Sequence, residues 1–169
     1  MLILFIVNLQ FCYFSGLWYL HTKDIVHGDV KPGNILVDER LERVKLCDFG
    51  ISRIKTRLLQ TTTMSFIRGT VIYMAPETCL QNVKPNFATD VWCAGATILE
   101  ILCPNEELWN VPARSDLSQY LERKMKKKAE PYALLQLQKR DKELYNKVKP
   151  AFVYDPKKRA TAKELYDMF

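Results

Sequence analysis

Blocks of apolar residues separated by polar breaks predict that most of this chain is helical. Residues 11–22 form one such block and stop at the polar sequence His-Thr-Lys-Asp, which predicts a helix. Residues 91–102 are apolar nearly all round, as in a central buried helix, and Thr89 and Asp90 stand where its N-terminal caps would lie. The N-terminal two thirds of the sequence therefore contain two predicted helices, and the second of them is the central one.

The C-terminal third predicts three more helices. A charged amphipathic pattern covers about residues 116–128, and a second helix is expected near 131–152, with Pro150 as its expected break. Thr161 followed three residues later by Glu164 is the capping-box pattern, so the last helix is expected to open there.

Two short runs of β-forming residues interrupt this helical pattern. Residues 35–37 and 44–47 flank the polar sequence Asp-Glu-Arg-Leu-Glu-Arg, which predicts a small hairpin. Residues 52–70 are rich in Thr and Ser and lack apolar periodicity, so we expect a long loop, and loops of this length are often functional. The expected fold class is mainly α with one small β-hairpin, α+β overall.

Length and charge indicate a single globular domain and argue against a nucleic-acid-binding protein. The chain has 169 residues, which suits one domain, and 48% apolar with 26% charged residues is typical of a globular protein. Lys and Arg total 25 against 19 Asp and Glu, and the excess lies in Lys-rich helical stretches of the C-terminal third. A nucleic-acid protein usually gathers this charge on a motif-bearing face, so we expect acidic partners and no nucleic acid.

The five cysteines indicate the compartment. They are odd in number and contain no C-x-x-C pair, which argues against a zinc site or a redox motif. We interpret them as reduced core thiols of a cytoplasmic protein, with the nucleus as the alternative, at Cys12, Cys47, Cys79, Cys93 and Cys103.

Residues 1–20 are almost wholly apolar. They lack the positive segment and small-residue cleavage site of a signal peptide, and they reach the length of a membrane span only by including polar residues. We favour a buried helix and keep a membrane anchor as the alternative.

Three short segments carry candidate chemistry in a fixed order. They are His-Gly-Asp-Val-Lys-Pro-Gly-Asn at 27–34, Asp-Phe-Gly at 48–50 and Ala-Pro-Glu at 75–77. Phosphoryl transfer needs a carboxylate to accept the proton of the attacking hydroxyl and oxygen ligands to hold Mg²⁺ on the phosphates. An Asp and an Asn five residues apart, with a second Asp after the next strand, supply both.

This order and spacing resembles the protein kinase family, whose signature is H-R-D-x-x-x-x-N, D-F-G and A-P-E. The resemblance extends from about Gly16 to Phe169 and implies the C-terminal lobe of a kinase. We therefore expect a nonstandard apolar segment at 1–15 and a partial kinase domain at 16–169.

The resemblance implies ATP and Mg²⁺ as cofactors and a role for each motif residue. Asp29 becomes the base that accepts the substrate proton, and Lys31 the cation on the transferring phosphate. Asn34 and Asp48 become the ligands of Mg²⁺, and Phe49 sets the geometry of the following loop.

The resemblance also implies three structural roles. His27 is expected to pack in the core, and Asp90 to anchor the catalytic loop from the central helix. Glu77 is expected to form a buried ion pair with Arg159.

The implied substrate is a protein with a Ser or Thr hydroxyl. Lys31 follows Asp29 by two residues, where tyrosine kinases usually place Ala, and Gly69-Thr70 before Tyr73 also fits the Ser/Thr pattern. The sequences IVHGDVKPGNILV and KLCDFGISR further resemble the tyrosine-kinase-like group of Ser/Thr kinases.

Two departures from the family pattern keep a second function open. Gly28 replaces the Arg that usually pairs with a phosphate on the activation loop, where the candidate phosphosites are Thr61, Thr62, Thr63 and Ser65. No G-x-G and no V-A-I-K strand occur in the 169 residues, so the lobe that clamps ATP is expected to be missing. The alternative is a catalytically impaired, kinase-like binding or regulatory module, with a partner protein covering the surface that this lobe would occupy.

Overall fold

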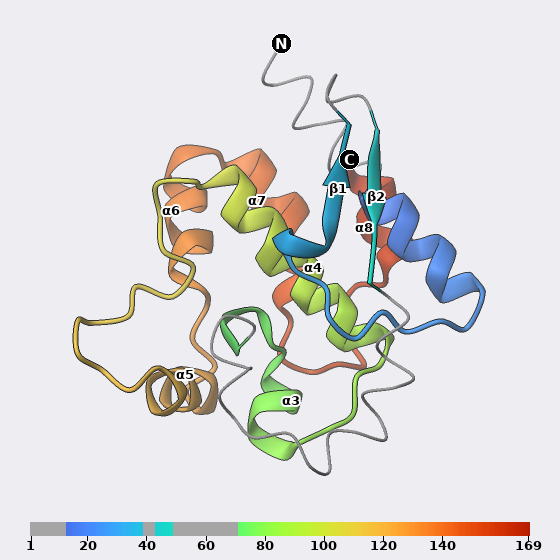
Figure 1. Cartoon of the computed structure of the whole chain (residues 1–169). Helices are drawn as coiled ribbons and strands as arrows, with labels where there is room; N and C mark the ends of the chain where they lie inside the picture. The colour runs from blue at the N-terminus through green and yellow to red at the C-terminus, as the bar shows by residue number, and fades with distance from the viewer. Residues whose placement is uncertain (1–12, 39–42, 49–70) are drawn as a thin grey trace.

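Helix α4 (Phe87–Leu102) runs through the middle of the structure, and several of the other helices pack against it (Figure 1). The structure is a computed structural model that describes residues 13–38, 43–48 and 71–169. The described residues contain a helix at 13–22, then η1 (Pro32–Asn34), β1 (Ile35–Val37), β2 (Val44–Leu46), η3 (Val71–Tyr73), α3 (Pro76–Gln81), α4, α5 (Leu117–Lys126), α6 (Tyr132–Arg140), α7 (Lys142–Val148), η4 (Lys149–Phe152) and α8 (Ala162–Met168).

Helix α4 is the buried helix that the apolar pattern predicts, but it begins earlier than expected. Asn86 is its N-cap, because its side-chain oxygen accepts from the amides of Ala88 and Thr89 at 2.9 and 3.1 Å. The Thr89 hydroxyl accepts in return from the Asn86 amide at 2.8 Å. The predicted role of Thr89 in the cap is therefore confirmed in part: Thr89 completes the capping box, but the N-cap itself is Asn86. Asp90 does not cap the helix. It lies inside the first turn, so its carboxylate is available for another element.

Close packing against η4 explains the glycine in the middle of α4. A Cβ on Gly95 would lie 2.6 Å from the Cβ of Ala151 and 3.1 Å from the ring of Phe152. The backbone of α4 at Gly95 therefore lies so close to η4 that no side chain fits between them, and only glycine is accommodated at this position.

The predicted hairpin is confirmed. Strands β1 and β2 pair antiparallel, with Ile35 opposite Leu46 and Val37 opposite Val44. The Cys47 amide donates to the Asn34 carbonyl at 3.0 Å, which closes the open end of the hairpin. The residues just before β1 and just after β2 are thereby held together.

The C-terminal helices differ from the sequence prediction in one place. The helix expected over 131–152 is divided at Asp141, whose backbone is extended and whose side chain caps α7 by accepting from the Leu144 amide at 2.9 Å. The α5 helix lies within its predicted range, and the capping box of Thr161 and Glu164 opens α8 as predicted. The short helix α3 was not predicted.

The helix at 13–22 lies beside α8 (Figure 1). Phe14 stacks on Phe169 with ring centroids 5.6 Å apart, and Trp18 contacts Tyr166 at 5.4 Å. The described part of the apolar N-terminal block is therefore packed against the core. Among the described helices, none has the length and apolar character needed to cross a membrane. Residues 1–12 and the predicted loop at 52–70 lie outside the described residues.

The four described cysteines are free thiols, as predicted, but only Cys103 belongs to the core. The others are half-buried, and burial raises the pKa of the Cys79 thiol to about 11. The expectation of core thiols is thus confirmed for one cysteine, and Cys12 lies outside the described residues.

Candidate active site

Asp90 fixes the segment that carries the first motif. Its Oδ2 accepts from the His27 amide and its Oδ1 from the Gly28 amide, both at 2.8 Å, and the Nε2 of His21 lies 3.2 Å from Oδ2. The Asp90 carboxylate is buried, so these bonds form away from water, where an unpaired carboxylate would be costly. The anchoring role predicted for Asp90 is confirmed, and His21 is a further member of this contact that the sequence analysis missed.

His27 is a core residue, as predicted. Its side chain is fully buried, and its Nδ1 accepts from the Asp29 amide at 3.3 Å. Burial lowers the pKa of this imidazole because the charged form loses its hydration. A neutral His27 thus supports the backbone directly before the candidate base.

Three predicted site residues meet at the Asp29 carboxylate. The Lys31 ammonium lies 2.9 Å from Asp29 Oδ2. The Asn34 amide nitrogen donates to the Asp29 carbonyl at 2.7 Å and to Oδ2 at 3.3 Å. Asp29 and Asn34 are buried and Lys31 is half-buried, so the carboxylate is held in place at the edge of the solvent.

Asp48 is brought to the same region by the hairpin. It follows Cys47, whose amide is bonded to the Asn34 carbonyl, and its own side chain is exposed. Its φ of 61° is left-handed, a conformation that Asp tolerates better than most residues. Phe49, also singled out by the sequence analysis, lies outside the described residues.

The oxygen ligands available here suit Mg²⁺. The Asn34 side chain uses its nitrogen for Asp29, so its second polar atom, the amide oxygen, is the one that can act as a ligand, and Asp48 adds an exposed carboxylate. No cluster of three metal-ligating side chains occurs within the described ranges. One or two protein oxygens, completed by phosphate and water, are what Mg²⁺ usually takes, so these residues fit the ion that the kinase resemblance implies.

The segment 71–75, which precedes the Ala-Pro-Glu motif, is held by residues that the sequence analysis missed. The Trp109 indole donates to the Ile72 carbonyl at 2.8 Å, and the Tyr73 hydroxyl donates to the Glu100 carboxylate. Burial and the bond to Glu100 raise the pKa of Tyr73, so the hydroxyl stays protonated as a donor. No sequence motif marks Trp109 or Glu100, because both act through contacts distant along the chain.

Comparison with known proteins identifies the family. The family described as "Protein kinase domain" matches residues 8–168. The mitogen-activated protein kinase HOG1 of Cryphonectria parasitica is 30% identical over 172 residues, which cover 88% of this chain and 46% of that protein. The MAP kinase kinase MKK1/SSP32 of Saccharomyces cerevisiae is 48% identical over 86 residues, which cover 51% of this chain and 16% of that protein.

A plant relative shows the same partial coverage. The L-type lectin-domain containing receptor kinase VI.2 of Arabidopsis thaliana is 42% identical over 92 residues, 53% of this chain and 13% of that protein. The chain thus spans less than half the length of each of these relatives. The motif order, the helical fold with its small hairpin and the match over residues 8–168 lead to one conclusion: the chain belongs to the protein kinase family.

Proposed function

We propose that this chain supplies the catalytic loop of a Ser/Thr protein kinase, which transfers the γ-phosphate of ATP to a protein hydroxyl. The observation that carries the proposal is the meeting of Lys31 and Asn34 at the Asp29 carboxylate, at 2.9 and 3.3 Å. The Ser/Thr class is supported by Lys31 at its position two residues after Asp29. It is supported too by a relative whose name reads "Serine/threonine-protein kinase RUNKEL", 44% identical over 85 residues.

In the proposed reaction the substrate oxygen forms a bond to the γ-phosphorus while the bond from this phosphorus to the leaving oxygen of ADP breaks. The hydroxyl proton passes to the Asp29 carboxylate, which the Asn34 amide orients. The Lys31 ammonium, next to the same carboxylate, offsets the negative charge on the transferring phosphate.

Asn34 and Asp48 would hold Mg²⁺. The ion, when bound, would supply positive charge that neutralises the phosphate oxygens. The hairpin contributes by closing at the bond from the Cys47 amide to the Asn34 carbonyl, which keeps the two ligand-bearing segments adjacent.

Phosphate transfer from γ-labelled ATP to a Ser-containing protein substrate tests the proposal. Asp29→Asn should lower the rate by at least about 100-fold, since general-base catalysis contributes about that much. Asp48→Asn should raise the Mg²⁺ concentration needed for half-maximal rate. Asp24→Asn is the matched control, because Asp24 is exposed and shares the positive φ of Asp48. Equal rates for all four proteins, with equal melting curves, would contradict the proposal.

The second candidate is a kinase-like binding or regulatory module that transfers no phosphate. It is favoured by Gly28 in place of the usual Arg and by the lack of any G-x-G within the 169 residues. Its partner would be a protein that covers the surface next to the hairpin, where Leu36 and Val37 are exposed. Transfer activity that Asp29→Asn abolishes would exclude this candidate.

We also infer a cytoplasmic setting, with the nucleus as the alternative. The four described cysteines are all free thiols, which suits a reducing compartment. Fractionation of the tagged chain, with the membrane pellet as the contrary result, tests this inference.

A further inference from the structure

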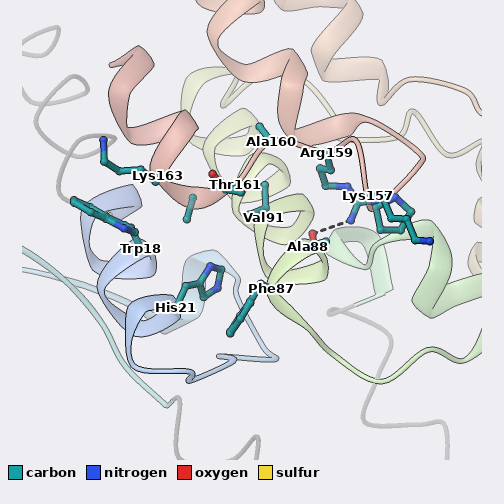
Figure 2. Close-up of a pocket in the computed structure, with 12 residues that line it drawn as sticks. Trp18, His21, Phe87, Ala88, Val91, Lys157, Arg159, Ala160, Thr161 and Lys163 are labelled. Atoms are coloured by element: carbon teal, nitrogen blue, oxygen red, sulfur yellow. Dashed lines mark hydrogen bonds between the residues drawn. The ribbon is translucent and has the colours of Figure 1, made fainter.

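A pocket at the start of α4 and a second pocket at the end of α5 differ in where their cations lie. Figure 2 shows the first, which opens between the helix at 13–22 and the start of α4. Its Lys157 side chain points away from the rings of Trp18 and Phe87 (Figure 2). The exposed cation and the aromatic wall of this first pocket therefore do not form one binding surface.

The second pocket lies between the end of α5 and the start of α6, far from the hairpin of β1 and β2 (Figure 1). Its volume is about 320 Å³, at the lower end of the range of ligand sites. Trp109, Tyr120 and Tyr132 supply aromatic rings to its wall, and Ala129 and Leu135 supply aliphatic groups. Leu135 is 38% exposed, so one apolar edge of this pocket is open to solvent.

Lys124 brings a positive charge to the wall of the second pocket. Its ammonium lies 5.3 Å from the centroid of the Tyr120 ring, which is itself part of the wall. It makes no ion pair with a carboxylate in the described ranges. The acidic lining residue Glu130 is already paired with Lys149 at 3.6 Å. An uncompensated cation therefore lies directly against an aromatic wall.

The positive charge continues from this pocket along the chain. Residues 123–128 contain five cations, at Arg123, Lys124, Lys126, Lys127 and Lys128. Lys126 pairs with Glu122 at 2.6 Å, whereas the side chains at 123, 127 and 128 are exposed and make no ion pair with another described residue. The Ala129 amide donates to the Lys124 carbonyl at 3.0 Å, so positions 127 and 128 lie between two residues of the pocket wall.

Lys128 occupies a backbone position that favours glycine. Its φ is 51°, and its amide donates to the Met125 carbonyl at 3.0 Å. Together with the bond from Ala129 to Lys124, this is the Schellman arrangement that ends many helices, with glycine as the usual residue at this position. A Cβ is disfavoured in the left-handed region, so Lys128→Gly is expected to keep the fold while it removes one charge.

The wall of the second pocket is ordered without a ligand. The Tyr120 hydroxyl donates to the Asn110 carbonyl at 2.9 Å, and the Tyr154 hydroxyl donates to the Ala129 carbonyl at 2.7 Å. An ordered wall lowers the entropy cost of binding. Asn110 also lines the pocket and is exposed, and its side-chain amide has the donor and the acceptor that a peptide backbone requires.

We propose that this surface binds an acidic peptide segment of a partner protein, with one aromatic side chain in the pocket and carboxylates beside Lys124 and Lys128. An aromatic ring suits the three rings of the wall, because aromatic pairs gain more than their buried area alone provides. The cations extend beyond the pocket over several residues, so they fit an extended chain with several carboxylates better than a small ligand with one. A concave wall that carries a polar amide also fits a peptide better than it fits the flat surface of an acidic membrane.

The experiment titrates the ¹⁵N-labelled 169-residue chain with the capped peptide Glu-Glu-Phe-Glu-Glu and follows the indole resonances. Trp109 lines the pocket whereas Trp18 and Trp92 do not, so the Trp109 resonance alone should shift. One buried ring and a few charge pairs predict a Kd on the order of 0.1 mM. A peptide with Ala in place of Phe should bind at least about tenfold more weakly. A peptide with Lys in place of every Glu should leave the Trp109 resonance unchanged.

Variants of the chain locate the contacts. Lys128→Gly should weaken binding of the peptide about threefold, while Lys158→Gln, which removes an exposed cation outside the pocket, should leave the Kd unchanged. Leu135→Ala should also weaken binding about threefold, whereas Met168→Ala, which removes a side chain of equal exposure in α8, should not. Salt at about 1 M should weaken binding as well, because it screens exposed charges beyond about 3 Å.

Four results would overturn the proposal. They are no shift of the Trp109 resonance, equal binding of the Phe and Ala peptides, equal effects of Lys128→Gly and Lys158→Gln, and binding to phosphatidylserine vesicles with none to the peptide. The last result would assign the cations to a membrane surface. Each is measured without phosphate transfer, so failure here leaves the proposed kinase activity untouched.

Discussion

Arg159 donates from both terminal nitrogens to the two carboxylate oxygens of Glu77, at 2.7 and 2.9 Å, across 82 positions of sequence. The same guanidinium donates to the carbonyls of Ala88 at 2.7 Å and Val153 at 2.9 Å, and it lies 5.1 Å from the ring of Trp92. One buried side chain thus joins α3, the start of α4 and the segment before α8. These bonds hold the three segments in fixed positions relative to one another.

Arg159→Ala should lower the melting temperature by about 10 °C. The substitution leaves the buried Glu77 carboxylate without its partner, which costs about 3–5 kcal/mol, and each kcal/mol corresponds to about 2–4 °C in a chain of this size. Differential scanning calorimetry measures the shift. Lys158→Ala, which removes an exposed neighbour, should change the melting temperature by less than about 2 °C. An unchanged melting curve for Arg159→Ala would reject a stabilising role for this pair.

Gly28→Ala should destabilise the chain by about 1–2 kcal/mol, because Gly28 has a φ of 77° and a Cβ is disfavoured in the left-handed region. The strain acts on the catalytic loop, since the Gly28 amide donates to Asp90. Urea unfolding measures the change. Gly33→Ala is the control, because a Cβ at Gly33 would meet no atom within 4 Å. Equal stability of the two variants would show that the loop relaxes without cost.

Local patterns predicted the parts of this fold that depend on neighbours in sequence. The hairpin at 35–37 and 44–46 follows from two β-forming runs around a polar turn, and Thr161 with Glu164 marked the start of α8. The cap of α4 was misplaced because Asn86 precedes a turn of mixed polarity, and the apolar pattern becomes continuous only from Val91.

Motif spacing predicted the residues of the candidate site. It did not predict all of the residues that hold the neighbouring backbone in place. Asp29, Lys31 and Asn34 lie within six residues of one another, so spacing alone places them together. His21 and Trp109 act on carboxylate and carbonyl groups 69 and 37 positions away, and no local signal indicates such partners. The sequence analysis also missed that Asp141 divides the expected helix into α6 and α7. An Asp within an amphipathic pattern gives no sign by itself that the chain turns there and that its side chain caps a new helix.

Gly95→Ala should destabilise the chain by about 1–3 kcal/mol, since the added methyl group would lie 2.6 Å from the Cβ of Ala151. The gain in helix propensity of about 1 kcal/mol opposes this only in part. Thermal unfolding measures the result. A double variant with Ala151→Gly should recover part of the loss, because it removes the clashing carbon. A rise in melting temperature for Gly95→Ala alone would contradict the close approach of α4 and η4.

Stability should fall as the pH drops below about 6.5, and His27 should account for part of this fall. Burial lowers the pKa of folded His27, whereas an unfolded His titrates near 6.5. Between these two pKa values the unfolded chain binds a proton that the folded chain does not, so acidification favours unfolding by at most about 1.4 kcal/mol per pH unit. Above about pH 7.5 the residue is neutral in both states, and its titration adds no pH dependence.

Urea unfolding of wild type and His27→Gln between pH 5 and 8 measures this effect. The variant will be less stable overall, because His27 is fully buried and accepts from the Asp29 amide. Its free energy of unfolding should nevertheless fall less steeply below pH 6.5 than that of wild type. Carboxylates titrate in both proteins, so the difference in slope reports on His27. Parallel pH profiles would mean that His27 titrates in the folded chain as it does in the unfolded one.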